Sequence, residues 1–185
     1  DRLYLNNKNG TFTDITEQSG IRNPRSPGTI AFADVNNDGW LDIFVANFGD
    51  PDFRFFDERY HLGQYNVLYL NNGDMTFTDV SEVAGVQGAP VYYYDEHRKS
   101  YDIYKTLLDA RGNRAGDPAG ESYAALFMDI DDDGDQDLWV GNDGGPQQIL
   151  RNDGDANGDG IPNFVDIAPE LGLDQVGAWM GYATG

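Results

Sequence analysis

The amino-acid sequence predicts an all-β protein built from repeated antiparallel sheets, and three observations support this prediction. Short stretches alternate apolar and polar residues between turns rich in Asn, Asp and Gly, a pattern typical of antiparallel strands. Helical periodicity is nearly absent. The chain also repeats itself, because residues 3–16 (LYLNNKNGTFTDIT) match residues 68–81 (LYLNNGDMTFTDVS) almost residue for residue. Self-similarity of this kind is typical of repeat architectures.

A second repeated element lies between these hairpin sequences. Residues 29–48 (TIAFADVNNDGWLDIFVANF) resemble residues 123–143 (YAALFMDIDDDGDQDLWVGND). A looser third copy of the hairpin occupies residues 149–153 and 163–173, and residues 177–185 resemble the start of another unit. The repeat therefore consists of two elements that follow each other along the chain.

One unit contains four expected strands, at residues 29–35, 41–48, 67–70 and 76–80. An acidic loop joins the first two, and a tight Asn-Asn-Gly turn joins the last two. Four short strands per repeat predict a blade of a β-propeller. The alternative is a β-sandwich whose hairpins are similar by accident, and the repeated order of the elements favours the propeller.

The chain is expected to form an arc of such a propeller, a partial propeller with two full blades and partial blades at each end. The expected divisions are the outer half of a blade at residues 1–20, full blades at 28–86 and 122–173, an insertion at 87–121, and the first strand of the next blade at 177–185. Insertions are tolerated in surface loops between blades. We expect the open strand edges to be covered by further blades of a longer chain or by neighbouring subunits.

The amino-acid composition limits the kinds of partner that this protein can bind. The 185 residues carry a net charge of −20 with a pI near 4.1, so the surface repels nucleic acid and anionic membrane and attracts cations. Hydrophobic residues make up 39%, which is enough for a folded core. Cysteine is absent, which excludes disulfides and thiolate metal sites. No apolar run is long enough for a transmembrane helix, so membrane insertion is not expected.

The acidic loops concentrate this charge at residues 34–42 (DVNNDGWLD) and 129–137 (DIDDDGDQD). Two carboxylates about 4 Å apart repel by roughly 4 kcal/mol at an effective dielectric near 20, so a bound cation would relieve the loops. Both loops place oxygen side chains at positions 1, 3, 5 and 9 and Gly at position 6, which resembles the first half of an EF-hand calcium loop. Magnesium is the weaker choice because it demands a tight octahedron and keeps its waters.

The candidate calcium ligands follow from this register. They are the side chains of Asp34, Asn36, Asp38 and Asp42 with the Trp40 carbonyl, and the side chains of Asp129, Asp131, Asp133 and Asp137 with the Asp135 carbonyl. The side chains of Asn37, Asp132 and Asp135 are expected to point into solvent. The alternative is a pair of ordinary Asx turns whose side chains bond their own backbone.

These motifs resemble the FG-GAP and VCBS repeats, a family that includes the integrin α-subunit propeller and many large secreted bacterial proteins. The residues that carry the resemblance are FADVNNDGWLDIFVAN, FMDIDDDGDQDLWVGN and the LYLNNG…TFTDV hairpins, which together cover most of the chain. The resemblance implies a calcium-binding propeller, but the motif is shared by proteins of many roles. Family propellers look like seven blades, and this chain has only two full units.

A third acidic loop, residues 155–163 (DANGDGIPN), interrupts the third hairpin and looks like the calcium loops of dockerin and thrombospondin-type repeats. Its candidate ligands are Asp155, Asn157, Asp159, Ile161 and Asn163. The sequence leaves open whether an ion binds here, because Asn is a neutral and weaker ninth ligand. Asp153 and Asp166 are the candidates to complete the shell.

Several other features suggest less. Tyr101, Tyr104 and Leu108 stand at helical spacing before Gly112, which favours a short helix packed on the rim over an aromatic platform for sugars. His61 and His97 have no partner pattern and are expected at the surface. The glycosylation sequon at residues 9–11 repeats as a hairpin turn and is interpreted as one.

The favoured function is a non-enzymatic calcium-binding module that acts in adhesion, or as a structural component of a secreted or cell-surface assembly. Extracellular calcium suits weak structural sites. One alternative is the propeller domain of a secreted polysaccharide-active enzyme, but nearly every acidic cluster already belongs to a candidate metal loop. The other is a lectin, although Trp40, Trp139 and Trp179 fall at different places in the repeat. A protein or polysaccharide ligand therefore stays open.

Overall fold

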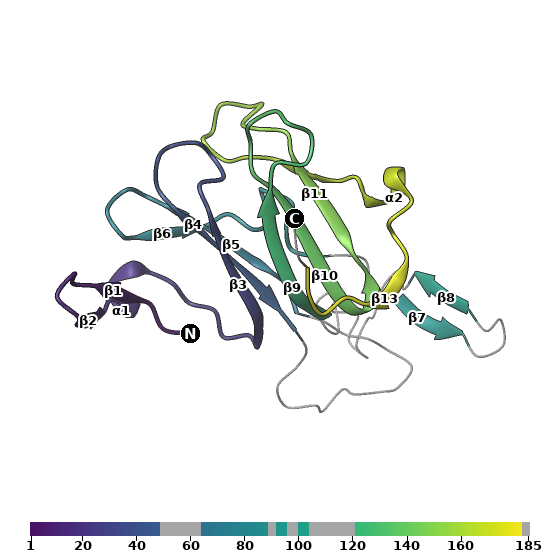
Figure 1. Cartoon of the computed structure of the whole chain (residues 1–185), viewed down its shortest axis with the longest axis horizontal. Coiled ribbons are helices and arrows are strands. Elements are labelled where there is room, and N and C mark those ends of the chain that lie inside the picture. The colour runs from purple at the N-terminus through teal and green to yellow at the C-terminus, as the bar shows by residue number, and fades with distance from the viewer. Residues whose placement is uncertain (49–63, 89–91, 96–99, 104–120, 183–185) are drawn as a thin grey trace, which may run out of the picture.

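The structure is a computed structural model that describes residues 1–48, 64–88, 92–95, 100–103 and 121–182 (Figure 1). Antiparallel strands dominate these residues, and the helices among them are two single turns, α1 (Thr16–Ser19) and α2 (Ala168–Leu171). No helix in this part of the chain is long and apolar enough to cross a membrane. The all-β prediction is confirmed.

The first sheet contains four strands in chain order. They are β3 (Pro27–Ala33), β4 (Asp42–Asn47), β5 (Val67–Asn71) and β6 (Phe77–Asp79). Every neighbouring pair is antiparallel, and all residues of β4 and β5 are buried. Strands buried on both faces require apolar side chains at nearly every position, as in the run Ile43–Ala46.

The second sheet repeats this arrangement with one addition. Its strands are β9 (Glu121–Met128), β10 (Asp137–Pro146), β11 (Gln148–Asn152), β12 (Phe164–Asp166) and β13 (Val176–Ala178). The added strand, β13, pairs with the far end of β10, beyond the residues that pair with β11. This short strand pairs with an edge of β10 that β11 leaves free. The expected start of a further unit at residues 177–185 stays a prediction. Gly141 permits the close approach, because a Cβ there would lie 2.5 Å from the Trp179 carbonyl oxygen.

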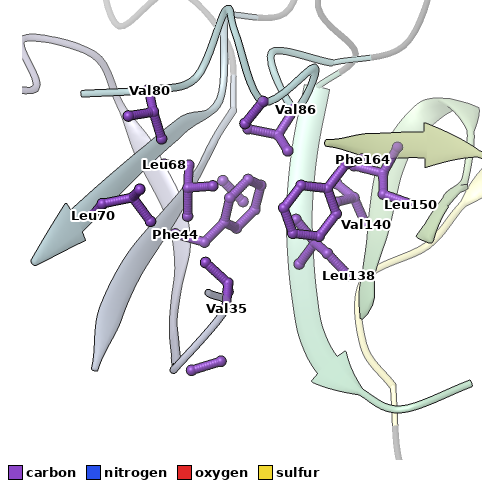
Figure 2. Packing of buried hydrophobic residues seen from close by; sticks show 13 residues of the cluster. Val35, Phe44, Leu68, Leu70, Val80, Val86, Leu138, Val140, Leu150 and Phe164 are labelled. Carbon is purple, nitrogen blue, oxygen red and sulfur yellow. The ribbon is translucent and has the colours of Figure 1, made fainter. Parts of the chain in front are cut away.

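The main hydrophobic core lies between the two sheets (Figure 2). Phe44 and Leu68 from the first sheet face Leu138 and Leu150 from the second, and all four are fully buried. Phe44 also packs edge-on against Phe127, with ring centroids 6.3 Å apart. Burial of each such side chain contributes about 1.5–3 kcal/mol, so this contact fixes the two sheets relative to each other.

An N-terminal hairpin, β1 (Tyr4–Asn6) and β2 (Phe12–Asp14), lies beside the other face of the first sheet (Figure 1). Leu3 packs there against a smaller cluster that includes Ile43 and Val45. Within the hairpin turn, the Asn9 side-chain oxygen accepts hydrogen bonds from the backbone and hydroxyl of Thr11. This geometry agrees with the interpretation of the sequon as a turn.

The helix expected in the insertion is wrong at its start. Strands β7 (Tyr92–Asp95) and β8 (Ser100–Ile103) form an antiparallel hairpin, in which Tyr101 pairs with Tyr94. Aromatic residues favour strands, and here the cross-strand pairing outweighs the helical spacing of three side chains. Tyr104, Leu108 and Gly112 lie outside the described residues, as do both histidines.

Candidate metal centre

The three acidic loops gather at one end of the molecule (Figure 1). Residues 34–42 join β3 to β4 and residues 129–137 join β9 to β10, so they occupy the same place in the two sheets. Residues 155–163 lie in the connection between β11 and β12. Strand order and turn position therefore bring the most acidic segments of the chain together.

The first two loops share one backbone conformation. The Asp34 carboxylate accepts hydrogen bonds from the backbone N–H groups of Asp38 at 3.0 Å and Gly39 at 2.9 Å. In the second loop, Asp129 accepts from Asp133 at 3.2 Å and Gly134 at 3.0 Å. The first-position aspartate thus closes each loop upon itself, as an Asx turn does.

Left-handed backbone conformations explain the residue types at positions 4 and 6. Gly39 and Gly134 have φ values of 90° and 96°, where glycine avoids the strain of a Cβ. Asn37 and Asp132 have φ values of 57° and 61°, in a region that Asn and Asp tolerate better than other residues. The glycine signal in the sequence is therefore a backbone requirement.

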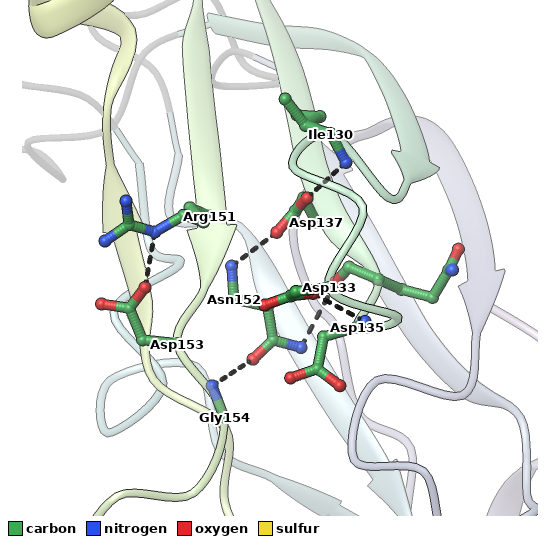
Figure 3. Close-up of polar contacts among 9 residues, drawn as sticks. Ile130, Asp133, Asp135, Asp137, Arg151, Asn152, Asp153 and Gly154 are labelled. Carbon is green, nitrogen blue, oxygen red and sulfur yellow. Dashed lines mark hydrogen bonds and ion pairs between the residues drawn. The ribbon is translucent and has the colours of Figure 1, made fainter.

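The ninth-position aspartates are the buried anchors of the two loops. Asp42 is fully buried and accepts hydrogen bonds from the backbone N–H groups of Val35 and Asn71, each at 2.9 Å. Asp137 is equally buried and accepts from Ile130 at 2.7 Å and Asn152 at 2.8 Å (Figure 3). Each carboxylate thereby ties the start of its acidic loop to the turn of the next hairpin.

Burial raises the pKa of both anchors. Desolvation is the main cause, and it raises the pKa of Asp42 to about 6 even though two backbone N–H groups favour the charged form. The pKa of Asp137 is raised for the same reason. The negative charges of Asp131 and Asp133 raise the pKa of Asp137 further. Each anchor therefore lies where a bound cation would stabilise its charge.

Carboxylate oxygens converge at the second loop. One oxygen each from Asp129, Asp131 and Asp137 lies within 4.8 Å of the other two, and this is the one such acidic group among the residues that the structure describes. Asp133 instead accepts a hydrogen bond from the Asp135 backbone through one oxygen. In the first loop, Asn36 stands where the second has Asp131, so its candidate ligand side chains include one carboxylate fewer. Hard oxygen ligands of this kind suit calcium.

Asn37 and Asp135, two of the side chains expected to point into solvent, form a hydrogen bond with each other at the surface. Asn37 donates from Nδ2 to the Asp135 carboxylate at 2.7 Å, which joins the first loop to the second. The two residues are 98 positions apart, so only the packing of the sheets brings them together. Asn37 and Asp132 are exposed as expected, whereas Asp135 is half-buried.

The third loop repeats the turn but completes no acidic cluster. Asp155 accepts hydrogen bonds from three backbone N–H groups, those of Gly158, Asp159 and Gly160, and these bonds lower its pKa. The fifth-position Asp159 accepts a hydrogen bond from the backbone N–H of Ile161 at 2.9 Å. In the other two loops the fifth residue likewise accepts from the backbone N–H of the seventh. The similarity extends to the backbone, yet the site has no buried ninth aspartate.

The residues that could complete a third shell have other partners. Asp153 forms an ion pair with Arg151 at 2.6 Å. Asp166 accepts a hydrogen bond from the Ala168 backbone at 3.0 Å, at the start of α2. Asn163 is exposed, and its backbone closes the base of the loop with Asp153 and Gly154. Ion binding at this loop stays a prediction.

Two asparagines were missed in the sequence. Asn71 and Asn152 are the first Asn of their hairpin motifs, and their backbone N–H groups bond the buried anchors described above. Their side chains also make matching hydrogen bonds. In each, Nδ2 donates to the backbone carbonyl of the eighth residue of the acidic loop. The Oδ1 atom accepts from the backbone N–H of Gly73 in the first sheet and of Gly154 in the second (Figure 3). The repeated Asn of LYLNN and ILRND was the available signal.

Comparison with known proteins identifies one repeat type. The family model described as "FG-GAP-like repeat" matches residues 1–45, which include the N-terminal hairpin, β3 and the first acidic loop. Residues 1–45 are therefore similar to an FG-GAP-like repeat, in agreement with the resemblance seen in the sequence. Such repeats are non-catalytic structural or adhesion modules, in agreement with the expectation of a non-enzymatic protein.

One curated relative is similar over a short stretch. Cartilage acidic protein 1 of Mus musculus is 35% identical over 60 residues, which is 32% of this chain. The matched stretch is 9% of the relative's length, so this chain spans only a small part of that protein.

Proposed function

We propose that this chain is part of a calcium-binding β-propeller of four-stranded antiparallel blades that acts outside the cell in adhesion or as a structural component. The observation that carries the proposal is the convergence of the Asp129, Asp131 and Asp137 oxygens at the second loop. The first loop has the same backbone hydrogen bonds and the same buried anchor, Asp42, which supports a second site.

A bound calcium ion would offset the repulsion among the carboxylates of each acidic loop. At the second loop the ligands would be the side chains of Asp129, Asp131, Asp133 and Asp137 with the Asp135 carbonyl, and at the first those of Asp34, Asn36, Asp38 and Asp42 with the Trp40 carbonyl. Calcium would supply positive charge and bind these oxygens, with no catalytic role. The chain's own residues set the loop shape and hold the buried anchors in place.

Exposed apolar residues support the proposed partners, which are further blades or neighbouring subunits. Tyr4 and Leu5 of the N-terminal hairpin are 52% and 39% exposed, whereas the equivalent Tyr69 and Leu70 of the first sheet are 2% and 7% exposed. The same motif is thus buried where a sheet continues beside it. Additional strands beside β1 would bury the N-terminal copy in the same way.

An extracellular location is part of the proposal. FG-GAP repeats are typically extracellular, and millimolar calcium outside cells fills sites of modest affinity. The similarity to Cartilage acidic protein 1 covers only a small part of that protein, so it supports a shared repeat more than a shared role.

Calcium binding is tested by two variants with equal change of charge. Asp131→Asn removes one of the converging carboxylates, and Asp132→Asn alters its exposed neighbour. Calcium at a hundred times its dissociation constant should stabilise the original chain by about 2.7 kcal/mol per site. Thermal unfolding with calcium or chelator should show less stabilisation for Asp131→Asn and an unchanged effect for Asp132→Asn. If the melting temperature of the original chain is the same in calcium and in chelator, the proposal is refuted.

A second candidate function, carbohydrate binding, is favoured by one cleft. The cleft has a volume of about 470 Å³, and its lining includes Asn36, Asp38, Trp40, Asn72, Gly73 and Ile161. The Trp40 side chain is partly exposed and lies against Gly73, so its indole could stack on a sugar ring. Retention on immobilised oligosaccharides should then be lost in Trp40→Ala and kept in Trp179→Ala.

A further inference from the structure

A continuous chain of hydrogen bonds links the anchors of the first two acidic loops. Asp42 accepts from the Val35 N–H at 2.9 Å, and the carbonyl oxygen of Val35 accepts from the Asn152 side chain at 2.9 Å. The backbone N–H of Asn152 then donates to Asp137 at 2.8 Å. We call the four residues Asp42, Val35, Asn152 and Asp137 the anchor relay, and all of them are buried.

Within the anchor relay, the Asn152 side chain donates hydrogen bonds to both loops. Its Nδ2 group bonds the Val35 carbonyl in the first loop and the Gln136 carbonyl in the second. Its Oδ1 accepts from the Gly154 N–H, just before the third loop. One buried amide therefore fixes backbone groups of the first two loops and the entry to the third.

The equivalent asparagine of the first sheet lacks the link between loops. Asn71 bonds Asp42, the Leu41 carbonyl and Gly73 in the same way, but these three hydrogen bonds all remain within its own sheet and loop. The bond from Asn152 to Val35 is thus an addition to a shared local scheme. The first loop is closed without an equivalent bond, so the bond from Asn152 to Val35 is not needed to close a loop. It joins the two loops to each other.

A second link lies at the surface. Asn37 donates to Asp135 at 2.7 Å and joins the fourth position of the first loop to the seventh position of the second. Asp135 also lies close to Gly154, where a Cβ would be 3.6 Å from its carboxylate. The loops therefore contact each other at an exposed and at a buried position.

We propose that calcium binding at the first and second loops is cooperative, and that Asn152, with the Asn37–Asp135 bond, couples them. This inference rests on the proposed calcium sites. An ion at one loop orders its anchor and the peptide groups bonded to it. Because Val35 bonds Asp42 through its N–H and Asn152 through its carbonyl oxygen, that ordering also restrains the second anchor. The second ion then has less conformational freedom to remove. The coupling is reciprocal by thermodynamic necessity.

The test follows both loops in one sample during a titration with calcium alone. The backbone amides of Gly39 and Gly134 report the first and second loop separately in nuclear magnetic resonance spectra, since each bonds the first aspartate of its own loop. Asp38→Ala disables the first loop. It should weaken calcium binding reported by Gly134 by about fivefold or more, the usual lower range of coupling between sites.

Variants of the links separate coupling from stability. In the Asn37→Gly/Asn152→Ala background, Asp38→Ala should leave the Gly134 response unchanged. Glycine is chosen at position 37 because φ is 57° there. Asn71→Ala is the matched control, which should weaken the first loop but retain the coupling. Should the Asn152 variant not fold, Asn37→Gly alone decides, with a smaller coupling expected.

Each outcome has a distinct meaning. If neither the Gly39 nor the Gly134 amide signal changes on addition of calcium, the proposed function itself is overturned. Signals that both respond, with no effect of Asp38→Ala on Gly134, would overturn the coupling and leave the calcium sites intact. Coupling that persists at full size in the folded link variants would equally exclude Asn152 and Asn37 as its carriers.

Discussion

The buried carboxylate of Asp42 accepts the backbone N–H of Asn71 at 2.9 Å, which joins the end of an acidic loop to the turn of a hairpin 29 residues later. Its other oxygen accepts the Val35 N–H. Asp137 makes the same two kinds of bond in the second sheet. The last aspartate of the motif is therefore as much a structural brace as a candidate ligand.

Removal of this brace should be costly even without metal. Asp42→Ala would leave two buried N–H groups without acceptors, each worth about 1–3 kcal/mol. We expect a loss of about 3 kcal/mol in the free energy of unfolding, measured by urea titration in chelator. Asp38→Ala, at an exposed position of the same loop, serves as the control and should cost less than about 1 kcal/mol.

The metal-free chain should lose stability as pH rises. The pKa of Asp42 is raised to about 6 in the folded state, above its ordinary value of 3.8. Its contribution to stability is therefore fully present below about pH 4 and is lost as pH rises through about 6. Urea unfolding in chelator at pH 5 and pH 7.5 should show this decline, and Asp42→Asn should flatten it. A decline of equal size in Asp42→Asn would assign it to other groups.

The loop glycines should resist substitution because of backbone conformation alone. A Cβ on Gly134 would meet no atom within 4 Å, yet φ is 96°. Gly134→Ala should therefore cost about 1–2 kcal/mol and weaken calcium binding at the second loop. In contrast, Asp132→Gly relieves the same kind of strain at φ 61° and should be neutral or slightly stabilising. Denaturant unfolding of both variants compares the two cases.

The two sheets should unfold together. Phe44 is fully buried between them, and Phe44→Ala should cost about 3–5 kcal/mol in the free energy of unfolding. Phe32 of the same sheet is 54% exposed, so Phe32→Ala should cost far less. Calorimetry should show one transition that shifts for Phe44→Ala. Two separate transitions would mean that the sheets are independent.

The local structure could be read from the sequence because it depends on neighbours in the chain. Short apolar runs between turns predicted β4 and β5, and Gly at position 6 marked the left-handed turns at Gly39 and Gly134. The expected helix beginning at Tyr101 failed, since periodicity over three side chains is weaker than strand pairing with β7. Strand β13 pairs with the free edge of β10, and no repeat pattern indicated that pairing.

The sequence by itself determined the strands, their order and the acidic positions of each loop, because turn geometry and side-chain alternation are local properties. Only the tertiary structure decided which loops touch. Asn37 meets Asp135, and Asn152 meets Val35 across 117 residues, because Phe44 and Leu138 pack the sheets face to face. The tertiary structure also raises the pKa of Asp42, because burial of its carboxyl depends on atoms from distant parts of the chain.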